Sequence, residues 1–391
     1  MEYRGWIGRP WPELNEGVLY TDTVKYPPST PVPSLLEYYV SKYKESASRK
    51  GWLQRIQNGQ IRVDGNVTTD ADFSLRGGAT LVYHRLPWRE PEVPYRLGVL
   101  YEDAHLLAVN KPSGLQVLPG GLFQQRTVLK QLEWYTAEKE KHQPASGVSS
   151  DEARLWKPAP VHRLGRGTSG LLLCAKSPAA KSRLAADLAA GTSVSIGRVQ
   201  KGNSEVDRRI SKTYRALASG IITEDEIVAE YPIGKVKYEG VAGGLYMASE
   251  SGGKPSRSKV TVLWRNVVDN RTLVEVQIFT GRPHQIRIHL AALGHPLVGD
   301  PLYVSGGRPR DDLNQAIPEN LEEKCLDPAE DGGYQRPEAV LPGDCGYLLH
   351  AWCLSFVHPF TSQEMTVVAP APPQLQLPAE KENATSGLSL S

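Results

Sequence analysis

A loop near the middle of the chain carries the side chains with the clearest capacity for chemistry. Residues 160–176 read Pro-Val-His-Arg-Leu-Gly-Arg-Gly-Thr-Ser-Gly-Leu-Leu-Leu-Cys-Ala-Lys, which predicts a polar loop between a short strand and an apolar strand. The glycines allow positive φ and the close approach of a ligand. Arg163 and Arg166 offer forked donors that suit phosphate. From residue types alone, a binding loop and a plain tight turn in a sheet are equally good interpretations.

Two common catalytic loops do not fit this stretch. A phosphate-cradling loop has lysine after its last glycine, whereas Leu171 follows Gly170. A nucleophile elbow has glycine two residues after its serine, and the residue two places after Ser169 is again Leu171. The sequence therefore predicts neither a nucleotide-phosphate loop of that type nor the elbow of a serine hydrolase.

The histidines and cysteines do not indicate a metal centre. His284, His289 and His295 follow one another closely, but no carboxylate or cysteine stands at helical spacing from them. The four cysteines are scattered without a Cys-x-x-Cys pair, which argues against zinc and against a disulfide framework. We expect no metal site and a reducing, intracellular setting.

Composition limits the class of protein. The 391 residues allow two or three domains, and a net charge of +2 means that any basic surface must be local. No apolar run approaches the ~18 residues of a transmembrane helix. The first thirty residues contain several acids and no apolar core, so no signal peptide is evident. We expect a cytoplasmic or nuclear protein that does not enter a membrane.

The loop needs a sheet to hold it, and the surrounding sequence supplies strands. Apolar runs predict strands at residues 99–101, 106–109, 212–217, 273–278 and 348–356. Apolar spacing and alanine content predict helices at residues 128–139 and 179–190. Pro283 suits the first turn of a further helix.

A compact pattern precedes these elements. Pro33-Ser34 can begin a helix, and Ser48 can cap a second helix that ends at Asn58-Gly59. Alternating residues then lead into a turn at Asp64-Gly65. The pattern predicts a domain organisation of an N-terminal arm at 1–30, a small module at 31–86, a proline-rich linker at 87–97, a main domain at 98–369 with an insertion at about 305–345, and a disordered tail at 370–391.

The small module resembles a known RNA-binding unit. Residues 48–65 read Ser-Arg-Lys-x-Trp-Leu-Gln-Arg-Ile-x-x-Gly-x-Ile-Arg-Val-Asp-Gly, which is similar to the module first known from the ribosomal small subunit, of the ribosomal-protein-S-four type. The resemblance implies that Arg49, Lys50 and Arg55 rest on RNA phosphates. Such contacts position RNA without reading its sequence. An ordinary solvated face of charges is the alternative for these residues.

The central loop also resembles that of a known family. His-Arg-Leu-x-Arg-x-Thr-Ser-Gly-Leu-Leu-Leu-x-Ala-Lys at 162–176 is similar to the catalytic loop of the RluA-type RNA pseudouridine synthases, and the stretches at 280–290 and 299–303 continue the match. The resemblance spans residues 33–84 and 98–368. It implies an α+β fold, with a large mixed and mostly antiparallel sheet around a central RNA-binding cleft, plus the small N-terminal α/β module.

The resemblance assigns roles to side chains. Gly165 stands where the family has its essential aspartate, Arg282 matches the arginine that pairs with that carboxylate, and Tyr214 matches the tyrosine that packs on the target base. The remaining substrate-binding residues that it implies are His162, Arg163, Arg166, Thr168, Ser169 and Lys212. It further implies that uridine in rRNA, tRNA or another structured RNA is isomerised without a cofactor, and we expect a monomer.

Gly165 leaves several hypotheses open, because glycine can act neither as nucleophile nor as a counter-charge for an arginine. The first hypothesis is an enzyme in which another group replaces the catalytic carboxylate. The second is a non-catalytic RNA-binding homologue, and the third is a small-molecule binder that has reused the cleft. The retained basic module argues against the third hypothesis. Asp300, Asp103 and Glu102 are the acids to consider as substitutes, although none is an obvious one.

Overall fold

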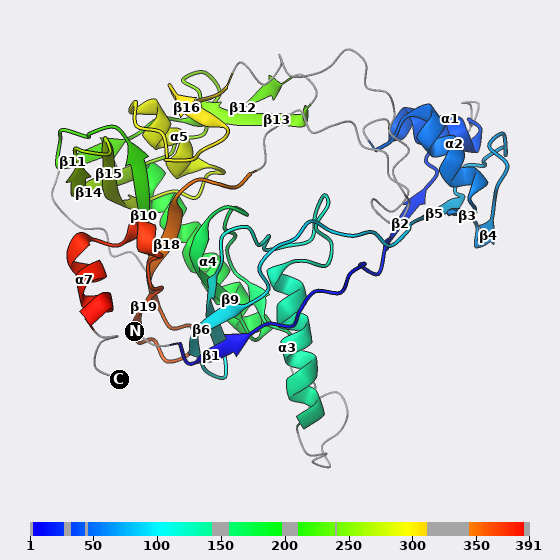
Figure 1. Ribbon diagram of the computed structural model, residues 1–391. Helices are drawn as coiled ribbons and strands as arrows, with labels where there is room; N and C mark the ends of the chain where they lie inside the picture. Colours follow the sequence, from blue (N-terminus) through cyan, green and yellow to red (C-terminus); the bar gives the residue numbers. More distant parts are fainter. Residues whose placement is uncertain are drawn as a thin grey trace.

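The computed structural model describes residues 3–26, 33–43, 46–142, 156–197, 210–238, 241–310 and 344–386. These residues form a large sheet with helices packed against it and a small α/β module near the N-terminus (Figure 1). In these segments no helix is both long and apolar enough to cross a membrane.

The main sheet has 11 strands and is mixed but mostly antiparallel, as the sequence predicted. Its path runs β1 (Gly5–Ile7), β6 (Leu97–Glu102), β7 (Leu106–Lys111), β9 (Ser169–Ala175), β18 (Leu349–Val357), β10 (Ile210–Ser219), β15 (Arg271–Ile278), β14 (Ser258–Asn266) and β11 (Glu226–Ala229). Two strands lie off this path, β19 (Glu364–Val368) beside β18 and β8 (Ala159–Pro160) beside β9.

The centre of the sheet holds its one parallel contact among the described strands, between β9 and β18. Only Ser169 with His350 and Gly170 with Ala351 are in register there. Gly170 has φ +106°, and a Cβ on it would lie 2.3 Å from the carbonyl oxygen of Ala351. Because parallel strands begin at the same end, the segments that precede β9 and β18 are brought together at one edge.

Both faces of the central strands are buried. Leu172 and Cys174 pack in one apolar cluster, while Leu171 and Leu173 pack in another cluster with Leu184 of α4 (Pro178–Gly197). A strand that is covered on both faces has a continuous apolar sequence rather than an alternating one. This explains the apolar run that follows the polar loop.

Several shorter elements surround the sheet. The helices are α3 (Val128–His142), α5 (Gln285–Ala292), α7 (Pro378–Ser386) and the 3-10 turn η2 (Pro373–Leu375). Two hairpins lie near α5, and they are formed by β12 (Ile233–Tyr238) with β13 (Val241–Ala248) and by β16 (Tyr303–Ser305) with β17 (Arg308–Pro309).

The N-terminal module has its own sheet and core. Its sheet order is β2 (Val18–Thr23), β5 (Thr80–Arg85), β3 (Ile61–Val63) and β4 (Asn66–Val67), and its helices are α1 (Leu35–Lys42) and α2 (Arg49–Gln57). Ser34 and Ser48 cap the two helices through their hydroxyl oxygens, as predicted. Asp64 and Gly65 have positive φ and form the predicted turn.

Two predicted boundaries near the N-terminus need correction. The residues expected to form an arm at 1–30 instead supply β1, which pairs with β6, and β2, which pairs with β5. The expected linker at 87–97 is not a solvated spacer, because Trp88 is fully buried and Glu90 is 2 % exposed. The carboxylate of Glu90 accepts hydrogen bonds from the backbone N–H groups at 124–126 and ties this segment to the main domain.

The predicted tail also needs correction. Within 370–386 the chain forms η2 and α7 rather than a disordered segment. Glu380 makes two hydrogen bonds to Arg215 of β10, at 2.6 and 3.0 Å, and Leu375 is buried. A buried partner far away in the sequence therefore orders a segment whose own composition is polar. Residues 387–391, and most of the predicted insertion at 305–345, lie outside the described residues.

Candidate active site

A pocket of about 700 Å³ opens at the edge where β9 and β18 begin. Most of its lining comes from three parts of the chain, namely the loop at 161–168, the start of β10, and residues 281–287 at the turn into α5. A few residues of α4, β13, β15 and the start of β18 complete it. Its volume lies within the ~300–1,000 Å³ that is usual for ligand sites. The loop with the predicted chemistry therefore forms one wall of a pocket large enough for a nucleotide.

Buried polar groups hold this loop in place from behind. Lys111 is fully buried, and its Nζ donates to the carbonyl of Arg166 at 3.1 Å and to two carbonyls of its own turn. The Gly114 N–H donates to the same Arg166 carbonyl, and the Ser113 hydroxyl donates to the Gly167 carbonyl at 2.7 Å. Burial lowers the pKa of Lys111 to about 7, while three carbonyl acceptors favour its ammonium form.

The space beside Gly165 is occupied by a tyrosine hydroxyl. A Cβ built on Gly165 would lie 2.8 Å from Oη of Tyr347 and 3.3 Å from Oγ1 of Thr168. Tyr347 is 3 % exposed, its hydroxyl lies 3.3 Å from that of Thr168, and burial raises its pKa to about 12. A protonated phenol thus fills the position from which an aspartate side chain would start.

The guanidinium next to this tyrosine belongs to Arg287, and not to Arg282, which the resemblance had singled out. Arg287 has a 2 % exposed side chain, and its Cζ lies 4.2 Å from the centre of the Tyr347 ring. It makes a forked ion pair with Asp300 at 2.8 Å and a third contact with Asp344 at 2.6 Å. Arg282 also lines the pocket, but its Nε donates to the Pro255 carbonyl, and it forms no ion pair within the described chain.

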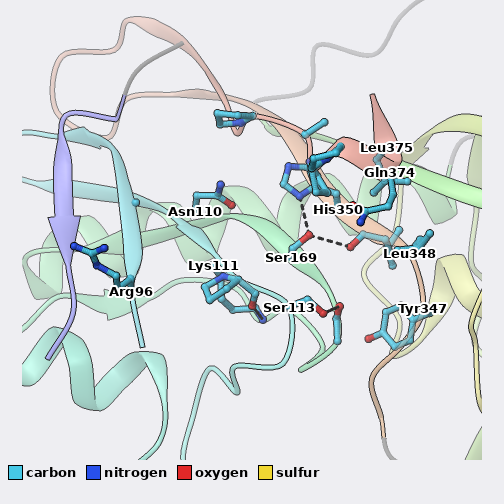
Figure 2. A pocket seen from close by; sticks show the side chains of 18 of the residues that line it. Arg96, Asn110, Lys111, Ser113, Ser169, Tyr347, Leu348, His350, Gln374 and Leu375 are labelled. Atoms are coloured by element: carbon cyan, nitrogen blue, oxygen red, sulfur yellow. Dashed lines mark hydrogen bonds between the residues drawn. The ribbon is translucent and has the colours of Figure 1, made fainter. Parts of the chain in front are cut away.

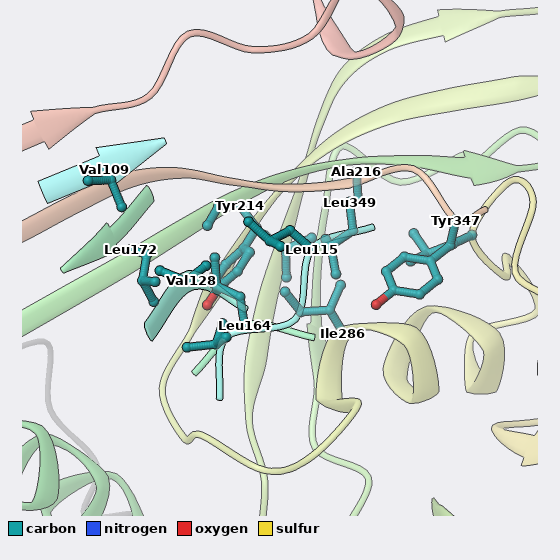
Figure 3. Close-up of a cluster of buried hydrophobic side chains, with 14 of the residues drawn as sticks. Val109, Leu115, Val128, Leu164, Leu172, Tyr214, Ala216, Ile286, Tyr347 and Leu349 are labelled. Atoms are coloured by element: carbon teal, nitrogen blue, oxygen red, sulfur yellow. The ribbon is translucent and has the colours of Figure 1, made fainter. Parts of the chain in front are cut away.

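Tyr214 faces the pocket from β10. It is 8 % exposed, and its hydroxyl has no hydrogen-bond partner among the described residues. Burial raises its pKa to about 12, so the phenol is protonated at neutral pH. Figure 3 shows Tyr214 and Tyr347 in one cluster that also contains Leu164 and Ile286, with Ile286 between the two tyrosines in this view. The pocket therefore carries a hydroxyl at each end of an apolar floor.

The pocket is also lined by two cations, Lys212 and Arg163, and by the neutral imidazole of His162. Lys212 is half-buried in the pocket, and burial lowers its pKa to about 8. Arg163 is exposed there, and no contact holds it within the described part of the chain. His162 accepts the N–H of Leu173 through Nε2 at 3.1 Å, and burial followed by the charge of Lys212 lowers its pKa to about 3. His162 is thus a neutral structural group, while Arg163 and Lys212 are available cations.

Two predicted substrate residues point away from the pocket. The Ser169 hydroxyl lies 2.8 Å from Nδ1 of His350 and faces a second cavity of about 600 Å³, as Figure 2 shows. The Arg166 guanidinium lies over the Phe123 ring at 5.0 Å and does not line the pocket. Both residues therefore stabilise the loop rather than contact what the pocket binds.

The predicted basic face of the N-terminal module is smaller than expected. Arg49 and Lys50 are exposed at the start of α2, and Arg49 pairs with Glu37. Arg55, however, is 1 % exposed and stacks on the Trp52 ring, with 4.6 Å between its Cζ and the ring centre. The expectation that Arg55 contacts RNA is therefore corrected, because its side chain belongs to the module core.

The three acids considered as substitutes for an aspartate at 165 are all engaged elsewhere. Glu102 pairs with Lys139 and Lys176 at 2.8 and 2.9 Å, and Asp103 accepts from His358 at 3.0 Å. Neither acid lines the pocket, and neither do Lys139, Lys176 or His358, with which they pair. Asp300 is near the pocket but is held in the forked pair with Arg287. The described residues contain no group of three or more possible metal ligands.

Sequence reasoning missed Arg287, Tyr347 and Asp344. Arg287 stands inside the quoted Gln-Ile-Arg segment, so the motif offered it as a second candidate beside Arg282. Tyr347 and Asp344 precede β18 and carry no motif of their own. Only the parallel pairing of β9 with β18 brings them to the loop.

Comparison with known proteins identifies relatives. The family described as RNA pseudouridylate synthase matches residues 105–292. RNA pseudouridine synthase 5 of Arabidopsis thaliana is 53 % identical over 388 residues, which cover 96 % of this chain and 98 % of that protein. RNA pseudouridine synthase 5 of Oryza sativa subsp. japonica is 52 % identical, with 96 % and 92 % covered.

More distant relatives carry related names. Ribosomal large subunit pseudouridine synthase D of Vibrio vulnificus is 29 % identical, and the match covers 90 % of this chain and 91 % of that protein. Among solved structures, the human protein RNA Pseudouridylate Synthase Domain Containing 1 is 24 % identical, covers 75 % of this chain and 96 % of that chain, and has a TM-score of 0.45.

Proposed function

Because this chain belongs to the RNA pseudouridylate synthase family, we propose that it isomerises uridine to pseudouridine in structured RNA, in the pocket between the loop at 161–168 and the turn before α5. The reaction breaks the bond between uracil N1 and ribose C1′, turns the base and joins C5 to the same carbon. The reaction forms as many bonds as it breaks and changes no oxidation state overall, so it needs no cofactor. The observation that carries this proposal is the pocket that contains Tyr214, Lys212 and Arg287 together.

The side chains of the pocket fit a nucleotide taken out of its stack. Enzymes that act on a base extrude it, and the cost of unstacking is a few kcal/mol. The ring of Tyr214 and the apolar floor offer a surface for the uracil, and Arg163 and Lys212 offer charges for the flanking phosphates. Arg49 and Lys50 of the N-terminal module would hold RNA further away from the reacting uridine.

A second candidate function is RNA binding without chemistry. Gly165 is the observation that favours it, because a carboxylate is absent from the loop. A pocket with cations and an aromatic ring, but no reacting acid, would grip a uridine and release it unchanged. The two functions differ in one product, since only isomerisation leaves pseudouridine in the RNA.

The test is to incubate the purified protein with unmodified transcripts of ribosomal and transfer RNA and to measure pseudouridine by nucleoside mass spectrometry. The name of the Vibrio relative makes large-subunit ribosomal RNA the first transcript to try. We expect pseudouridine to form at defined positions, and the Tyr214→Ala variant to form far less. Tight binding of these transcripts without any pseudouridine would instead support the second candidate.

We propose that the protein acts as a monomer, because the lining of the pocket needs no residue from a second copy to bring Tyr214, Lys212 and Arg287 together. Light scattering at the concentrations of the assay tests this, and a dimer that dissociates with loss of activity would contradict it.

A further inference from the structure

The segment that precedes β18 packs directly on the loop that lacks its carboxylate. β9 and β18 begin side by side, so residues 344–348 run beside residues 161–168. A Cβ on Gly167 would lie 2.8 Å from the carbonyl oxygen of Asp344 and 2.8 Å from Cε1 of Tyr347. A Cβ on Gly165 would meet the Tyr347 hydroxyl. Glycine at both positions is what lets this segment approach so closely.

The same segment brings a carboxylate to Arg287. The Oδ1 atom of Asp344 lies 2.6 Å from Nη1 of Arg287, whose other nitrogens are held by Asp300. The two acids differ in their surroundings. The Asp300 side chain is fully buried and also accepts the N–H groups of Leu302 and Tyr303, whereas the Asp344 side chain is 41 % exposed. Asp300 is therefore fixed in the fold, and Asp344 is the acid of this pair with an open face.

We propose that Asp344 supplies the carboxylate that the loop lacks at position 165, with Arg287 as the residue that orients it. The inference rests on the proposed function, since it names the reacting group for the same reaction. Asp344 does not itself line the pocket, but its half-exposed carboxylate is bound to Arg287, which does. The glycines at 165 and 167 make room for the segment that carries Asp344.

The chemistry balances without any co-reactant. One oxygen of the Asp344 carboxylate forms a bond to ribose C1′ as the C1′–N1 bond breaks, and the electron pair leaves with the uracil as an anion. After the base has turned, C5 attacks C1′ and the bond to the carboxylate oxygen breaks, which restores Asp344. The proton on C5 is lost to water, and N1 takes up one proton from water, so the product is an isomer of the substrate.

Asp344→Asn is the decisive variant, because it keeps the size of the side chain and removes its charge. The fold should survive, since Arg287 keeps its forked pair with Asp300. We expect the rate of pseudouridine formation to fall by about a hundredfold or more, which is the scale for loss of one reacting group. Binding of the same transcript, measured by fluorescence anisotropy, should change by less than about threefold.

Glu380→Gln is a matched control. Glu380 has a 41 % exposed side chain and pairs with Arg215, whose side chain is 6 % exposed, so this pair resembles that of Asp344 and Arg287 in burial. The difference is that Arg287 lines the pocket, whereas neither Glu380 nor Arg215 does. The two variants should lose similar amounts of stability, and only Asp344→Asn should lose the reaction.

A second carboxylate offers a rescue. In the background of Asp344→Asn with Tyr347→Phe, the hydroxyl that blocks a side chain at position 165 is gone. Adding Gly165→Asp should then recover at least about a tenth of the lost rate, because a carboxylate again lies beside Arg287. No recovery in a folded triple variant would count against the inference.

The outcomes separate the inference from the function on which it rests. Wild-type activity that persists in Asp344→Asn overturns the inference and leaves the proposed function standing. A wild type that binds the transcripts but forms no pseudouridine on any of them overturns both. Wild-type activity that is lost in Asp344→Asn and kept in Glu380→Gln, with RNA binding intact, supports both.

Discussion

The hydroxyl of Tyr214 has no hydrogen-bond partner within the described residues, and it is not one of their enclosed, unpartnered polar atoms. Because Tyr214 lines the pocket, its hydroxyl is open to whatever the pocket binds. The neighbouring phenol of Tyr347 is satisfied by Thr168. At the residue scale, the two tyrosines of the pocket therefore have different expected roles.

Tyr214→Phe should affect the reaction far more than the fold. Removing this hydroxyl breaks no hydrogen bond in the described protein, so the free energy of unfolding should change by less than about 0.5 kcal/mol. The rate of pseudouridine formation should fall by roughly tenfold or more if the hydroxyl contacts the nucleotide. Thermal melting and a single-turnover assay measure the two quantities. A lower melting temperature with an unchanged rate would make Tyr214 a core residue only.

Gly165→Asp alone should destabilise the protein. Its Cβ would lie 2.8 Å from Oη of Tyr347, so the tyrosine must move and lose its contact with Thr168. We expect a cost of about 1–3 kcal/mol, as for other overpacked sites. Tyr347→Phe removes the blocking atom, and the double variant should therefore be more stable than the sum of the two single changes predicts. If chemical denaturation shows that the two single changes in unfolding free energy simply add in the double variant, the proposed clash is contradicted.

Sequence reasoning at this scale identified the loop but misplaced some contacts within it. The resemblance gave His162, Arg163, Thr168, Lys212 and Tyr214, all of which line the pocket. It could not separate Arg282 from Arg287, because both lie in the same matched segment and only burial distinguishes them. A motif fixes the order of residues along the chain, but Arg282 lies in the turn before α5 and Arg287 lies in the helix itself, and this difference decides which side chain is buried.

At the scale of elements, α2 separates its two arginines. Arg49 lies in the first turn with its side chain 60 % exposed, whereas Arg55 lies in the last turn with its side chain under Tyr83 and over Trp52. Arg49→Ala with Lys50→Ala should weaken RNA binding and reduce the slope of log K against log salt by up to about 2, because fewer counterions are released. Their melting temperature should stay close to that of the wild type.

Arg55→Ala should instead lower stability and leave the salt dependence of RNA binding unchanged. Loss of a fully buried side chain stacked on Trp52 should lower the free energy of unfolding of the N-terminal module by about 2–4 kcal/mol. The salt slope of RNA binding should remain unchanged as long as the module is folded. Hydrogen exchange of α1 and α2 would reveal local opening. A reduced salt slope with unchanged stability would place Arg55 on the RNA instead.

The boundaries of helices and strands could be predicted from the sequence where short-range interactions determine them. The serine caps at 34 and 48 and the turn at 64–65 depend on short-range hydrogen bonds and on backbone preference, so the sequence predicted them. The helix α7 was missed, because its order depends on Arg215, which lies far away in the sequence. β1 was missed for the same reason, since its partner is β6.

At the scale of the whole molecule, the sheet order decides the site. The late strand β18 inserts between β9 and β10, so the end of the chain completes a pocket that begins at residue 161. Nothing in the local sequence encodes that insertion, and the contribution of Tyr347 and Asp344 could therefore not be predicted. The sheet class itself could be predicted, because apolar runs and turn residues mark each strand.

The molecule as a whole should be sensitive to mild acid, because burial keeps several histidines neutral. Burial lowers the pKa of each of these residues to about 3 or 4 from an ordinary value of 6.5, and they are His162, His284, His289 and His350. In the unfolded chain the same side chains take up protons below pH 6.5. The unfolded state therefore binds more protons than the native state between about pH 6.5 and pH 4.

Linkage gives the sign and the size of this effect. Where the unfolded state binds more protons, stability rises with pH, so it must fall as the pH drops from 6.5 towards 4. Each proton contributes about 1.4 kcal/mol per pH unit, so four histidines give a slope of up to about 5 kcal/mol per pH unit near pH 5. Urea unfolding at pH 7.5, 6.0, 5.5 and 5.0 measures that slope. A flat dependence until the carboxylates titrate near pH 4 would mean that these histidines are protonated in the folded protein, which would contradict their neutral, buried role in the sheet and the loop.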